Sequence, residues 1–247
     1  MDKKPTVIYI ISDRRSGSTL LENILSKSEQ VVSVGELSNL NGHILKDGPG
    51  EKWNWTCACG QAVLNCPFWS NILKDLYTED TSVDFETNVE WNYKSKKLAA
   101  IAASPLLFRK KLMSFLKKRK NRNVAPTVRN IYQAIFEKTG KSFIVDSSKD
   151  PIQALAVYNN SKDFNVKIIW LKRDVRALAV SKMKWKTVNE KKKKSLKKVM
   201  LDIFFYKRLC LAVSGLVSKD DLVTLNYEAL ATETQKSLDI ITAKTGL

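Results

Sequence analysis

Short, mostly apolar runs alternate with stretches of helical periodicity along most of this chain. The runs at residues 7–11, 31–34, 143–145, 166–171 and 222–225 are rich in β-branched side chains, which is typical of strands buried on both faces. Between them, apolar residues recur three and four positions apart, as Leu21, Ile24 and Leu25 do. Strands that alternate with helices predict an α/β fold of three layers, α/β/α, around a central parallel sheet.

Two stretches interrupt this alternation. Residues 39–67 have little periodicity and are rich in Asn, Gly, Trp and Cys, which predicts a long irregular loop. Residues 89–120 predict a Lys-rich helical insertion that Pro105 divides in two. A further helix is expected at 127–138, ended by Gly140. A length of 247 residues favours one domain, residues 1–247, with these two additions.

The charge of the chain points to an anionic partner. Lys and Arg number 42 against 25 Asp and Glu, a formal net charge of +17, which suits a nucleotide, an acidic polymer or a membrane surface. The apolar run near the amino terminus is too short for a signal peptide and is followed at once by Asp13 and Arg14. No stretch is long enough for a membrane span, so we expect a cytoplasmic protein.

The turn after the first run has the composition of an anion site. A strand that passes directly into a helix points the first N–H groups of the helix and its positive dipole end beyond the carboxyl edge of the sheet. The residues that could hold a phosphate or sulfate there are Arg14, Arg15, Ser16, Gly17, Ser18 and Thr19. The turn is P-loop-like, but it lacks the Gly-Lys pair of the nucleoside-triphosphate P-loop. The alternative is a turn that only begins a helix.

Further polar residues follow the other predicted strands. Glu36 follows the second run, and Lys149 lies in the segment Asp-Ser-Ser-Lys-Asp-Pro after the third, where Pro151 begins a helix. Arg173 follows the fourth run, and Ser181 lies on the next helix, so the two could hold one phosphate together. Ligands of parallel sheets bind beyond the carboxyl ends of the strands, where all these residues would meet.

The segment RRSGSTLLENIL resembles the 5′-phosphosulfate-binding loop of sulfotransferases that use 3′-phosphoadenosine-5′-phosphosulfate (PAPS), in the branch with the tyrosylprotein, carbohydrate and many bacterial enzymes. This resemblance implies that Arg15 contacts the 5′-phosphosulfate and that Arg173 and Ser181 bind the 3′-phosphate. It also implies that Tyr227, in the turn Asn-Tyr-Glu, lies near the adenine.

The same resemblance implies an activity. A sulfuryl group would move from PAPS to an acceptor hydroxyl or amine by in-line displacement, with Glu36 as the base and with Lys149 and Arg15 as the cations. By analogy with phosphoryl transfer, these side chains suffice without a metal ion. The implied partners are PAPS, its product adenosine 3′,5′-bisphosphate (PAP), and a glycan, peptide or small-molecule acceptor.

Other interpretations stay open. His43, the only histidine of the chain, is an alternative base. The P-loop-like turn also fits a kinase that uses ATP and Mg²⁺. The Lys-rich stretches, including residues 191–194, fit a protein that binds nucleic acid without catalysis, although the sequence holds no recognised nucleic-acid motif.

Three cysteines gather in the 39–67 loop. Cys57, Cys59 and Cys66 could bind zinc together with His43, or Cys66 could form a disulfide with Cys57 or Cys59. The C-x-C spacing is tighter than that of usual zinc sites, and a reducing cytosol disfavours a disulfide. We therefore favour reduced cysteines in a packed loop, an interpretation that stoichiometric zinc would overturn.

Overall fold

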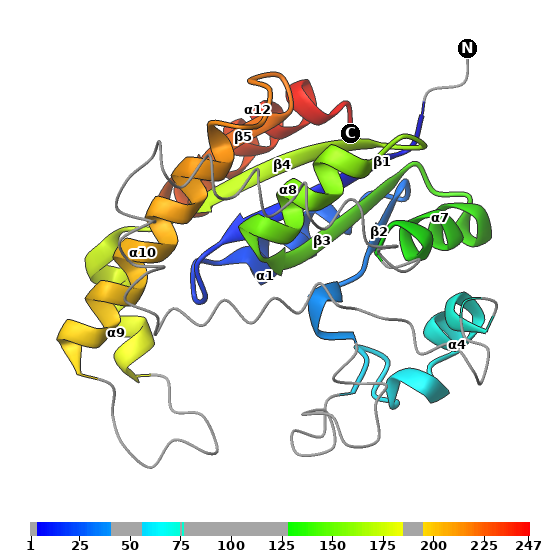
Figure 1. The fold of residues 1–247 in the computed structure, drawn as a ribbon, viewed down its shortest axis with the longest axis horizontal. Helices are drawn as coiled ribbons and strands as arrows, with labels where there is room; N and C mark the ends of the chain where they lie inside the picture. Colours follow the sequence, from blue (N-terminus) through cyan, green and yellow to red (C-terminus); the bar gives the residue numbers. More distant parts are fainter. Residues whose placement is uncertain (1–3, 41–55, 75, 77–127, 185–194) are drawn as a thin grey trace.

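The computed structural model describes residues 4–40, 56–74, 76, 128–184 and 195–247 (Figure 1). Within them, five parallel strands form one sheet in the order β2-β3-β1-β4-β5. The strands are β1 (Thr6–Ser12), β2 (Val31–Ser33), β3 (Phe143–Lys149), β4 (Asn165–Lys172) and β5 (Leu222–Asn226). The predicted parallel sheet is confirmed.

Helices cover both faces of the sheet, because successive side chains of each strand point to opposite faces. Ile8 and Ile10 of β1 pack toward α1 (Ser18–Leu25), α11 (Tyr227–Thr232) and α12 (Thr234–Thr245). Val7 and Tyr9 pack toward α7 (Val128–Thr139), α8 (Pro151–Asn160) and α10 (Leu196–Ser214), and α8 crosses the near face of the sheet in Figure 1. The three-layer fold is therefore confirmed.

Smaller elements extend the second face. Helix α4 (Pro67–Leu73) contacts α7 and adds Trp69, Ile72 and Leu73 to its core. It follows two short 3-10 helices, η1 (Leu37–Asn39) and η2 (Val63–Asn65). Helix α9 (Val175–Lys184) packs against α10, and the two bury a small apolar cluster of their own.

The structure lengthens one expected strand and adds one helix that the sequence did not predict. Strand β3 runs to Lys149 instead of ending at Val145, because the buried side chains of Asp146, Ser147 and Ser148 are hydrogen-bonded in the interior. Because residues 146–149 are polar, the apolar run in the sequence does not reveal where β3 ends. The 19-residue helix α10 was not predicted at all, since large apolar residues such as Phe204 are exposed on it and blur its periodicity.

Other expectations lie outside the described residues. These are the helical insertion at about 89–120, residues 41–55 of the predicted loop, and the Lys run at 191–194. Among the described helices, none combines the length and the apolar composition that crossing a membrane requires.

Candidate active site

The strand order brings the predicted site residues into one row at the carboxyl edge of the sheet. From β2 to β5, the strands or the residues just after them supply Glu36, Lys149, Arg15, Arg173 and Tyr227 in that order. Neighbouring strands lie about 4.8 Å apart, so the row spans roughly 19 Å. A cavity of about 1150 Å³ lies along this edge, and its wall includes Glu36, Lys149, Arg15 and Arg173.

The turn after β1 lies where the chain connections diverge. From β1 the chain continues toward the β2 edge of the sheet, and from β4 it continues toward the opposite edge, to β5. The point between β1 and β4 where these directions diverge is the usual place of a ligand crevice in such sheets. Helix α1 begins there after Gly17, whose φ of 90° is left-handed, and no side chain caps the helix start. The ring of Tyr227 lies so close to Gly17 that a Cβ atom would collide with it. The start of α1 is thus left open toward the cavity.

Two arginines meet at this turn. Arg15 Nε donates a hydrogen bond to Ser181 Oγ (3.3 Å), and Arg173 Nη1 donates one to the Arg15 carbonyl oxygen (2.7 Å). The Arg173 guanidinium also lies 4.5 Å from the centre of the Tyr227 ring, a cation–π contact. Among the described residues, neither arginine has a carboxylate partner, and the buried Arg173 Nε has no hydrogen-bond acceptor. Two adjacent positive charges and an uncapped helix start together fit an anionic ligand.

A largely buried ion pair also fixes the turn after β1. Asp13 Oδ1 and Lys182 Nζ form an ion pair of 2.6 Å, and both side chains are largely buried. Burial raises the pKa of Asp13, and the attraction of Lys182 opposes that shift. This pair ties the end of α9, with Ser181 beside it, to the turn.

The other end of the row holds a carboxylate and an amine. Lys149 Nζ and Glu36 Oε1 form an ion pair, and Asn39 Nδ2 donates to the second Glu36 oxygen at 3.0 Å. Only 12 % of the Lys149 side chain is exposed, against 44 % for Glu36, so the carboxylate is the more accessible of the two groups on the cavity wall. The Tyr206 hydroxyl donates to the Lys149 carbonyl and holds the backbone there.

Both predicted catalytic cations have a strained backbone. Arg15 (φ 72°) and Lys149 (φ 68°) are the non-glycine residues with positive φ in the described part of the chain. Such conformations cost about 1–3 kcal/mol each and occur preferentially at functional sites. The observation therefore marks the same two residues that the sequence singled out.

Comparisons with known proteins give the fold. No family model and no curated protein matches the chain in sequence. Its structure is similar to the sulfotransferase domain from the curacin biosynthetic pathway, with a TM-score of 0.54, 14 % identity, and coverage of 100 % of this chain and 75 % of that one. A sulfotransferase from Mycobacterium tuberculosis H37Rv is similar with a TM-score of 0.51 and 12 % identity, covering 100 % and 68 %. This chain has a sulfotransferase-like fold.

Within this sulfotransferase-like fold, the structure assigns an unexpected role to Glu22. Its buried carboxylate accepts hydrogen bonds from the Ser33 and Ser147 hydroxyls and from the Gly35 backbone N–H (2.8 Å). Glu22 on α1 thereby fixes the segment that carries Glu36 against β3. Its sequence signal is a carboxylate on the same helix face as the buried Leu21 and Leu25.

A second buried carboxylate lies under Lys149. Asp146 accepts hydrogen bonds from the Tyr132 hydroxyl (2.6 Å) and from the Ser148 N–H (2.7 Å). Complete burial raises its pKa from 3.8 to about 6, although these hydrogen bonds oppose the shift. Ser148 in turn accepts from the Ser38 N–H at 2.9 Å, a second tie to the Glu36 segment.

Not every predicted ligand residue reaches the cavity. Its wall includes Arg14, Gly17, Ser18 and Thr19 as well as the residues of the row on β2, β3, β1 and β4. Ser16, Ser181 and Tyr227 are not part of this wall: Ser16 is buried, Ser181 contacts Arg15, and Tyr227 packs on Gly17. The nucleotide contacts expected for these three stay predictions.

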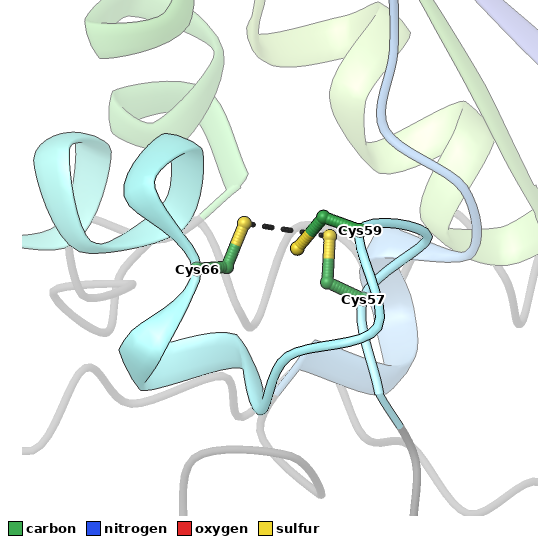
Figure 2. A group of neighbouring side chains, drawn as sticks. All are labelled: Cys57, Cys59 and Cys66. Carbon is green, nitrogen blue, oxygen red and sulfur yellow. Dashed lines mark hydrogen bonds between the residues drawn. The ribbon is translucent and has the colours of Figure 1, made fainter.

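The three cysteines of the 39–67 segment also lie on the cavity wall. Cys57, Cys59 and Cys66 are free thiols whose Sγ atoms all lie within 4.8 Å of one another (Figure 2). The structure thus brings the predicted trio together, whereas His43 lies outside the described residues.

Proposed function

We propose that this chain is a sulfotransferase that moves a sulfuryl group from PAPS to an acceptor hydroxyl or amine. The observation that carries the proposal is the row along the sheet edge, because its order follows the order of the reacting parts. The proposed base Glu36 and the cation Lys149 lie at one end of the row, and the turn with Arg15 lies in the middle. Arg173 follows, beside the ring of Tyr227.

The middle of the row suits the nucleotide. Arg15 and the open start of α1 would bind the 5′-phosphosulfate, since both offer N–H donors and line the same cavity. Arg173 would bind the 3′-phosphate, with its unpartnered Nε as a donor, and Ser181 would orient Arg15 or share that phosphate. Tyr227 already stacks on Arg173 and would limit the adenine side.

The end of the row suits the transfer step. Glu36 would take the proton from the acceptor O–H or N–H, and the acceptor atom would form the new bond to sulfur as the bond from sulfur to the bridging phosphate oxygen breaks. Lys149 would neutralise the charge that develops on this leaving oxygen. The ion pair between the two side chains supports this assignment, because it keeps the proposed base and the proposed cation next to each other. This step needs no metal ion.

The test combines binding and transfer. We expect the purified chain to bind PAP without Mg²⁺ and to transfer labelled sulfate from PAPS to a member of a glycan, peptide and small-molecule panel. Glu36→Gln should keep PAP affinity and lose transfer by roughly 10²- to 10⁴-fold, because it removes the proposed base and leaves Arg15 and Arg173 unchanged. Arg173→Ala should weaken PAP binding.

Arg176→Ala is the matched control. Its side chain is 92 % exposed and its guanidinium pairs with Asp174, so both binding and transfer should stay unchanged. Full transfer by Glu36→Gln would refute the assigned base. Binding of ATP with Mg²⁺ and none of PAP would refute the proposal in favour of a kinase. The acceptor class and the cytoplasmic location stay predictions from the sequence.

A further inference from the structure

Three cysteine side chains converge from two separate stretches of the chain. Cys57 and Cys59 lie on one tight turn, and Cys66 precedes α4. Figure 2 shows their sulfur atoms pointing toward one another, and all three Sγ atoms lie within 4.8 Å of each other. The Cys57 and Cys66 sulfurs are 3.4 Å apart.

These separations can be compared with three arrangements of sulfur. Tetrahedral zinc with Zn–S bonds of about 2.3 Å holds its sulfurs about 3.8 Å apart, a value inside the observed range. A disulfide requires about 2.05 Å and would leave the third sulfur without a role. Packing of thiols in an apolar core does not explain the cluster either, because Cys59 is exposed.

The backbone positions the three ligands. An antiparallel bridge joins Thr56 to Ala62, and the Cys57 N–H donates to the Gln61 carbonyl at 2.8 Å. In this hairpin turn the Sγ atoms of Cys57 and Cys59 lie within 4.8 Å of each other. The Cys66 N–H donates to the Ala62 carbonyl at 2.9 Å, which returns the chain to the same place.

We propose that Cys57, Cys59 and Cys66 bind one zinc ion that links this turn to the start of α4. Each thiol loses its proton as its sulfur coordinates the ion, and thiolate ligands favour zinc over magnesium or calcium. Within the described residues, no fourth His, Cys, Asp or Glu joins the group.

The ion would have a structural role beside the transfer site. All three cysteines belong to the cavity wall, together with Val63 and Trp69 of the same segment. Fixing the turn to α4 would hold this part of the wall in place, while Glu36 and Lys149 stay outside the metal's coordination. The inference does not depend on the proposed function. It reverses the preference for packed thiols that the C-x-C spacing alone gave.

The experiment measures metal in the full chain. Protein purified under reducing conditions without added chelator should contain one zinc per chain by inductively coupled plasma mass spectrometry. Cobalt exchanged into the site should give the thiolate-to-cobalt charge-transfer bands and the intense visible bands of tetrahedral coordination. Cys66→Ala and Cys59→Ser should lose the metal and these bands.

Cys210→Ala is the matched control, because Cys210 is a buried free cysteine of α10 outside the cluster. It should keep the zinc. Cys59→Ser removes an exposed side chain, so it keeps the test valid should Cys66→Ala fail to fold. Wild-type protein without zinc and without cobalt bands, with four reactive thiols, would overturn the proposal. A mass lower by two hydrogens in the freshly purified protein, showing a disulfide, would overturn it as well.

Discussion

The left-handed backbone of Lys149 allows strain and charge to be separated by two substitutions at one position. With φ of 68° at the end of β3, an L-residue costs roughly 1–2 kcal/mol more than it does in an ordinary strand. Lys149→Ala removes the amine and keeps this strain. Lys149→Gly removes the amine and releases the strain as well.

The expected magnitude follows from the difference between the two variants. Both lose the ion pair with Glu36 and the buried stem of the side chain, so these losses cancel. Glycine in an ordinary strand is about 0.5–1 kcal/mol less stable than alanine because of its backbone entropy. Subtracting this cost from the relief of strain leaves Lys149→Gly more stable than Lys149→Ala by up to about 1.5 kcal/mol.

Denaturant unfolding of both variants measures this difference in stability. A PAPS transfer assay measures how much activity is lost with the Lys149 amine. Lys167 on β4 provides the control pair, because it too is a strand lysine in an ion pair, with Asp221 at 2.7 Å, and its φ is not positive. There Lys167→Ala should be more stable than Lys167→Gly. Alanine more stable than glycine at both positions would refute the strain argument. Full transfer by either Lys149 variant would refute the role of its amine.

Two further predictions concern the turn and the buried carboxylate. Gly17→Ala should lower the free energy of unfolding by about 2–5 kcal/mol and weaken PAP binding, because the left-handed strain adds to a collision with Tyr227. Gly140→Ala, equally left-handed but without a neighbour within 4 Å, should cost only about 1–2 kcal/mol and leave binding unchanged; equal effects would contradict the collision. The pKa of Asp146 is 3.8 in the unfolded chain and about 6 in the native state. Between these two pH values the native state keeps a proton that the unfolded chain loses, so the free energy of unfolding should fall as the pH rises from about 4 to 6. Relative to Asp146→Asn, the wild type should lose up to about 3 kcal/mol between pH 4 and 7 in urea titrations, and parallel curves would contradict this.

The fold was predictable from the sequence largely because its three central strands, β1, β3 and β4, are buried on both faces. Such strands appear as continuous apolar runs, and each run ends in a polar turn that parallel topology brings to one edge. Arg15, Arg173 and Glu36 could therefore be placed at the same edge of the sheet without any knowledge of the strand order. The order itself, with β3 between β2 and β1, depends on how the helices pack and leaves no local signal.

What the sequence did not reveal lies mostly in polar contacts across the sheet. Glu22 bonds to Ser33 and Ser147, and the latter is 125 positions away in the chain, so no spacing rule links them. The same hydrogen bonds extend β3 beyond its apolar run. The contact between the Tyr227 ring and Gly17 was not foreseen either, because it depends on how β5 and α11 pack against α1.

The two residues with a strained backbone, Lys149 and Arg15, are both cations, and they differ in how their charges are paired. Lys149 is paired with Glu36, whereas among the described residues Arg15 meets only the neutral hydroxyl of Ser181 and supplies its own carbonyl to Arg173. The site therefore holds more positive charge than its carboxylates neutralise, on backbone that is itself strained. Neither feature stabilises the chain alone, since like charges repel and left-handed residues raise the energy. An anion bound between the cations would offset the repulsion between them, so the excess positive charge that weakens the fold locally would favour the binding of the proposed phosphosulfate.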